Sequence, residues 1–115
     1  MDLKMITCKF AQLSAMGEEA MQDCLPFCRD AAAEITLRCL AEAAPAEPLA
    51  AAAAALAYYR WCLACFSGSA VPHLGQATLV TAETVKAACT LMEQYLQAAS
   101  PWLREDQFYF GQVRA

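Results

Sequence analysis

The stretch that most constrains the fold runs from Leu49 to Phe66 and reads LAAAAAALAYYRWCLACF. It carries a single charge, Arg60, and contains neither glycine nor proline. Alanine is the strongest helix former, and the run is longer than a typical strand, so it predicts one helix. A helix that is apolar on every side has to be surrounded by other helices or by lipid. We expect the chain to be organised around it, with the wider part of the core filled by Tyr58, Tyr59, Trp61, Leu63 and Phe66.

A membrane-spanning helix is the alternative interpretation of this stretch. Its length approaches the roughly 20 residues that a span needs. Arg60 inside the stretch and the weak insertion energy of alanine argue against insertion. The N-terminus carries Lys4 and Lys9 and has no continuous apolar core of the kind a signal peptide needs. We therefore expect no membrane partner, and a reducing cytosol in which the seven cysteines stay free.

The composition favours one self-associating domain. With 115 residues and no linker, residues 1–115 are expected to form a single domain with a real core. Hydrophobic residues make up 59% of the chain and charged residues 17%, where about 25% charged is typical, so other subunits are expected to cover some apolar surface. The net charge is -4 and the basic residues are scattered, which argues against a nucleic-acid partner.

Apolar spacing predicts further helices before the central one. Residues spaced by three and four place one stripe on a first helix that ends near Ser14. A second helix starts near Gly17, and Pro26 predicts either a kink or a new helix start. After Pro26 the buried stripe is expected to comprise Cys28, Ala32, Ile35 and Cys39. A break from Ala44 to Pro48 then precedes the central helix.

The C-terminal part predicts one more long helix and a small ribbon. Thr81 can cap a helix with Glu83 in its first turn, and Pro101 fits the start of one final turn. Gln76–Thr81 and Gln107–Val113 have the composition of short strands. The predicted fold is therefore mainly α: a bundle of about four helices around a central alanine-rich helix, with a two-stranded β ribbon that needs support from helices or from another subunit.

The cysteines suggest two kinds of chemistry, each with a simpler explanation. Cys62 and Cys65 follow Trp61 in a W-C-x-x-C pattern, but a redox pair works at a helix start and this one lies near a helix end. Cys24 and Cys28, together with that pair, could offer four zinc thiolates. Structural zinc sites usually take ligands from loops, so cysteine used as a small hydrophobic residue is favoured. No cofactor or metal is expected.

No pattern in the chain predicts an enzyme. His73 is the only histidine and has no nucleophile at motif spacing. The neighbouring carboxylates of Glu18 and Glu19 do not face one another on a helix, and the same holds for Glu105 and Asp106. Phosphate-binding loops, H-E-x-x-H and G-x-S-x-G are missing from the sequence. Catalytic residues are therefore expected to be absent.

The candidate functional residues belong to an interface. Arg60 must either extend to the surface or pair with a carboxylate, because an unpaired buried charge costs several kcal/mol. The partner carboxylate can lie in the same chain or in another subunit. Two apolar segments near the C-terminus could supply edge strands or an interface. The candidate interface residues are Arg60, Leu79, Val80, Phe108, Tyr109 and Phe110.

Four segments resemble the small helical head-tail connector proteins of tailed phages and prophages of gut bacteria. They are Cys28–Ile35, Ala50–Trp61, Gly75–Thr81 and Phe108–Gly111. Gln76 stands where the family pattern has an acidic residue after the glycine. The resemblance implies a structural function, with subunits in a ring that joins the capsid portal to the tail. It implies portal and tail proteins as partners, a location in the bacterial cytoplasm or the virion, and no catalytic residues.

Two other interpretations stay open. A small cytosolic helical module could bind an unknown partner and dimerise through the same helices. A thiol or zinc protein would show bound metal or a cysteine of low pKa. Assembly into a ring separates the connector from the interaction module.

Overall fold

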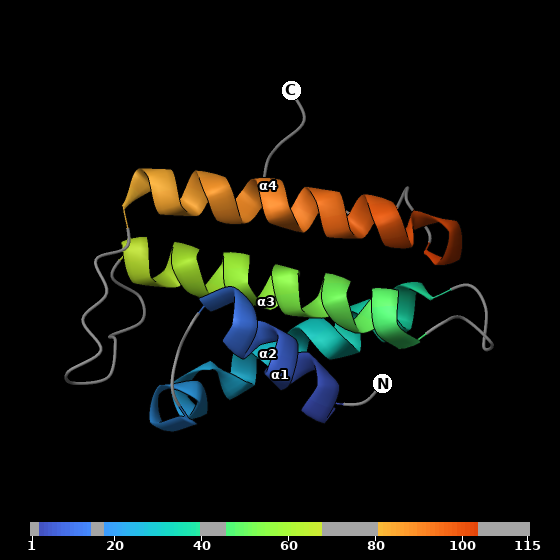
Figure 1. The fold of residues 1–115 in the computed structure, drawn as a ribbon, viewed down its shortest axis with the longest axis horizontal. Helices are drawn as coiled ribbons and strands as arrows, with labels where there is room; N and C mark the ends of the chain where they lie inside the picture. The colour runs from blue at the N-terminus through green and yellow to red at the C-terminus, as the bar shows by residue number, and fades with distance from the viewer. Residues whose placement is uncertain (1–2, 15–17, 40–45, 68–80, 104–115) are drawn as a thin grey trace.

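The fold is a helical bundle. The computed structural model describes residues 3–14, 18–39, 46–67 and 81–103 (Figure 1). In these ranges the chain forms α1 (Leu3–Ser14), α2 (Glu18–Arg38), α3 (Ala46–Ser67), α4 (Ala82–Ala99) and the short 3₁₀ helix η1 (Ser100–Trp102). The predicted mainly helical architecture is confirmed.

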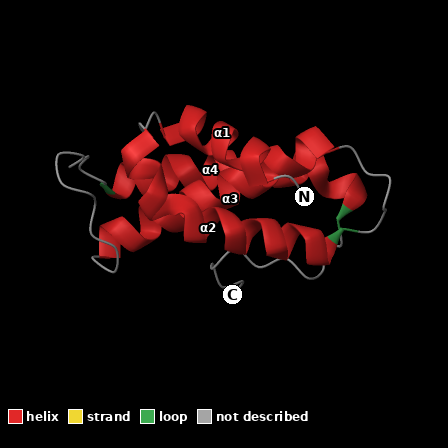
Figure 2. Ribbon diagram, turned by 90° about the horizontal axis from the view of Figure 1, so that it is seen from below, coloured by secondary structure: helices red, strands yellow, loops and turns green. Residues whose placement is uncertain are grey.

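Helix α3 is the centre of this bundle, because it packs against all three other helices. Figure 1 shows α4 running alongside α3 in the opposite direction, while α1 and α2 lie on the other side. Helix α2 is also antiparallel to α3, and α1 packs against both α2 and α3. Figure 2, the view from below, shows α1 and α2 flanking α3. The expectation that the chain is organised around the alanine-rich helix is confirmed.

The alanine run explains how three helices can pack around one. Every residue from Ala52 to Ala57 is at most 1% exposed. Methyl side chains allow close approach from several directions, so no side of α3 needs a polar stripe. Helix α3 begins at Ala46, inside the predicted break. Pro48 does not prevent this start, because it falls in the first turn, where its missing N–H removes no helical hydrogen bond.

The aromatic end of α3 is buried by edge-to-face ring contacts. Trp61 is 5% exposed and meets Phe27 of α2 with ring centroids 5.6 Å apart and an interplanar angle of 78°. Tyr58 meets Phe10 of α1 at 6.0 Å and 86°. Phe66, in contrast, is 54% exposed, so its predicted place in the core is wrong. It is one residue from the end of α3, where burial by the neighbouring helices declines.

Helices α1 and α2 follow their predicted apolar stripes in part: of the four positions predicted on α2, Cys28 and Ile35 are buried, and Cys39 is only partly buried and lies beyond the end of the helix. The buried side chains of α1 are Ile6 and Phe10, as its spacing indicates. Helix α2 is continuous through Pro26, whose exposed position leaves the freed carbonyl one turn earlier accessible to water. On α2 the buried stripe passes through Ala31, whereas the predicted Ala32 is only partly buried.

Helix α4 starts at the predicted cap. The backbone N–H of Thr84 donates to Oγ1 of Thr81 at 3.2 Å, and the N–H of Thr81 donates back to Oγ1 of Thr84 at 3.4 Å, which forms a capping box. Its buried side chains are Ala88, Met92, Leu96 and Ala99. Unlike α1 and α2, which also pack on one another, α4 relies mainly on α3.

Most of the predicted β ribbon lies outside the residues that the structure describes. Residues 76–80 and 107–113 lie outside the described part of the chain, and Thr81 serves as the α4 cap. Within the described ranges, the strand-like pairing is a single antiparallel bridge between Cys39 and Leu103. This bridge connects the end of α2 to the end of η1.

Helix α3 also meets a length and composition test for a membrane span. Its segment Ala46–Phe66 has a mean hydropathy of 1.4 in its most apolar window, and 61% of that window is buried inside the bundle. A buried core helix passes the same test, so the result does not distinguish the two environments.

The tight packing around α3 generates a stability prediction. Replacing Ala54 with Leu adds volume where the side chain is 0% exposed, so Ala54→Leu should lower the free energy of unfolding by about 1–3 kcal/mol. Ala87→Leu makes the same change on the exposed face of α4 and should stay within about 0.5 kcal/mol of the original protein. Urea denaturation followed by circular dichroism measures both. Equal effects at the two positions would contradict close packing around α3.

Candidate functional site

Of the candidate interface residues, the structure describes Arg60. Leu79, Val80, Phe108, Tyr109 and Phe110 lie outside the described ranges. The same holds for His73, Glu105 and Asp106, and the side chains of Glu18 and Glu19. The interface prediction therefore stays a prediction for all of these residues, and the structure describes only the contacts of Arg60 within its own chain.

Arg60 forms an ion pair with α2. Its Nη2 donates to Oε1 of Glu34 at 2.5 Å, and the two side chains are 32% and 25% exposed. The expectation that Arg60 reaches a carboxylate is confirmed, and the carboxylate belongs to the same chain. The sequence alone does not identify Glu34 as the partner of Arg60, because the two residues are 26 positions apart and only tertiary packing brings them together.

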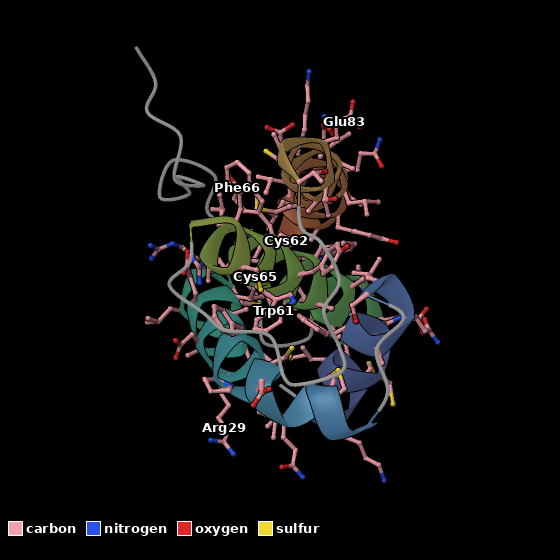
Figure 3. The ribbon with its side chains drawn as sticks, turned by 90° about the vertical axis from the view of Figure 1, so that its left-hand side faces the viewer. Arg29, Trp61, Cys62, Cys65, Phe66 and Glu83 are labelled. Atoms are coloured by element: carbon pink, nitrogen blue, oxygen red, sulfur yellow. The ribbon has the colours of Figure 1, made fainter. Side chains whose placement is uncertain are left out.

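Two exposed apolar side chains lie at opposite ends of the antiparallel pair α2–α3. Leu37 near the end of α2 is 69% exposed, and Phe66 near the end of α3 is 54% exposed. Figure 3 looks at the end where α3 stops and labels Phe66 there. Sequence reasoning missed Leu37, although its spacing of two residues from the buried Ile35 places it off the buried stripe.

The packing of α2 on α3 gathers four thiols into one cluster. Cys24 and Cys28 of α2 are 0% exposed, Cys62 of α3 is 1% exposed, and Cys65 is partly buried. The charges that these thiols would carry affect one another, since Cys28, Cys65 and Cys62 each contribute to the pKa of Cys24. The Phe27–Trp61 ring contact packs against the same interface, and Figure 3 labels Trp61, Cys62 and Cys65 on α3. We call these four residues the thiol cluster.

Burial keeps the cluster protonated. Burial, followed by the neighbouring Cys28, raises the pKa of the Cys24 thiol to about 12. Burial also raises the pKa of Cys28 to about 11, and that of Cys62 to about 11 against a lowering hydrogen bond with Tyr58. A redox or nucleophilic cysteine needs a lowered pKa, because the thiolate is the reactive form. The W-C-x-x-C pattern therefore lacks the electrostatics of a redox site.

A further thiol, Cys89 of α4, hydrogen-bonds within its own helix and lies beside Tyr59 of α3. The Sγ of Cys89 donates to Oε2 of Glu93 at 3.9 Å. Burial, followed by Glu93, raises the pKa of Cys89, and burial also raises the pKa of the neighbouring Tyr59, with Cys89 as the next cause. Burial and Glu93 thus favour the protonated thiol, whereas the hydrogen bond with Tyr59 acts to lower the pKa of Cys89.

The described residues hold no ready metal centre. Among them, no group of three or more His, Cys, Asp or Glu side chains is placed so that it could hold a metal ion. The four cysteines that could supply zinc thiolates share an interface, but they do not surround a common point. No polar or charged residue is buried in the described part of the chain either.

The fold and these contacts define a small α-helical bundle with a protonated thiol cluster in its core. No protein-family model matches the chain, and no curated protein or solved structure matches it either.

The Arg60–Glu34 pair should couple energetically. In a double-mutant cycle with Arg60→Met and Glu34→Gln, we expect a coupling of up to about 1 kcal/mol that decreases with added salt, because both side chains are partly exposed. The matched control pairs Arg60→Met with Asp30→Asn, since Asp30 is exposed one turn earlier on α2. Urea denaturation measures both cycles. Equal coupling in the two cycles would show that the ion pair adds nothing specific.

The raised thiol pKa values predict a loss of stability in alkaline solution. Unfolded thiols lose their protons near pH 9.0, whereas Cys24 and Cys28 in the folded chain keep theirs to about 12 and 11. Above pH 9 the folded state therefore binds more protons, and the free energy of unfolding falls as the pH rises toward 11.

Denaturation at pH 8, 9, 10 and 10.5 tests this dependence. Cys28→Ala should show a shallower fall than the original protein, whereas the exposed Cys8→Ala should show the same fall. If Cys28→Ala leaves the slope unchanged, the buried thiols do not cause the pH dependence.

Proposed function

We propose that the chain is a non-enzymatic assembly subunit of the phage head-tail connector type, in which copies form a ring between the capsid portal and the tail. The observation that carries the proposal is the position of Leu37 and Phe66 at opposite ends of the α2–α3 pair. Head-to-tail association needs two different surfaces on each copy, and such contacts close into rings when the rotation permits.

The chemistry of the described side chains supports a structural role. The thiols of Cys24, Cys28 and Cys62 are held protonated by burial, and the charge of Arg60 is neutralised by Glu34. These polar contacts maintain the fold and provide no activated nucleophile. A non-enzymatic protein is therefore the better interpretation.

The predicted strands complete the proposal. Gln76–Thr81 and Gln107–Val113 would supply a ribbon whose free edge pairs with a neighbouring subunit. In that arrangement Leu79, Val80, Phe108, Tyr109 and Phe110 would lie at the contact between copies, together with Arg60. Portal and tail proteins would be the further partners.

The alternative is a small cytosolic interaction module that dimerises through the same helices. The exposed Leu37 and Phe66 are equally compatible with this alternative, because a dimer contact can also cover an exposed apolar side chain. Ring formation distinguishes the two functions.

Light scattering coupled to size-exclusion chromatography over a wide concentration range tests the connector. We expect a ring-sized oligomer whose population increases with protein concentration. Electron microscopy should show closed rings. A chain that remains a monomer or dimer at every concentration, alone and with a portal protein, would favour the interaction module.

Two variants test whether the exposed side chains make the contacts. Leu37→Ser and Phe66→Ser should each shift the oligomer to smaller species without loss of helix content, because each removes one of the two different surfaces. Ala33→Ser is the matched control, since Ala33 is also exposed on α2 but is small. Rings that persist in both apolar variants would exclude Leu37 and Phe66 from the interface.

A further inference from the structure

We draw no further inference here: the strongest candidate, the exposed apolar surface at Phe66 near the end of α3, belongs to the contacts already used in the proposed function, and nothing in the described part of the chain shows what covers it.

Discussion

The structure depends on the burial of α3 from all sides. The buried side chains of α3 itself are mostly methyl groups. Alanine contributes little apolar area per residue, so the bulk of the core comes from the neighbours, with Ile6 and Phe10 from α1, Ile35 from α2 and Met92 from α4. Each neighbouring helix therefore supplies large side chains to the small ones of α3. The arrangement tolerates close helix approach but leaves little room for added volume.

The packing is uneven around this centre. Helices α1 and α2 support one another as well as α3, whereas α4 relies on one buried face, its capping box and the Cys39–Leu103 bridge beyond its end. Helix stability in proteins comes largely from tertiary packing of an apolar face, so α4 depends on its packing against α3 more than on any other contact. Opening of α4 would leave the packing among α1, α2 and α3 in place.

Periodicity and propensity predicted the helices, the central position of the alanine run and the Thr81 cap, because these depend on neighbours along the chain. The predictions that were wrong or incomplete concern burial and side-chain partners that tertiary packing determines. Ala31 and Ala32 are equally apolar, and only the orientation of α2 on α3 selects Ala31. Phe66 belongs to the apolar run but lies beyond the cover of its neighbours, and Arg60 finds its carboxylate 26 residues away. The interface residues outside the described ranges remain predictions.

The same burial determines what the cysteines can do. In water a thiol near its ordinary pKa is partly ionised in mild alkali and reacts readily, but at the α2–α3 interface ionisation is opposed by desolvation and by neighbouring sulfurs. This opposes nucleophilic and redox reactivity at these buried thiols, because the thiolate is the reactive form. Cys24, Cys28 and Cys62 therefore serve this core as small apolar side chains.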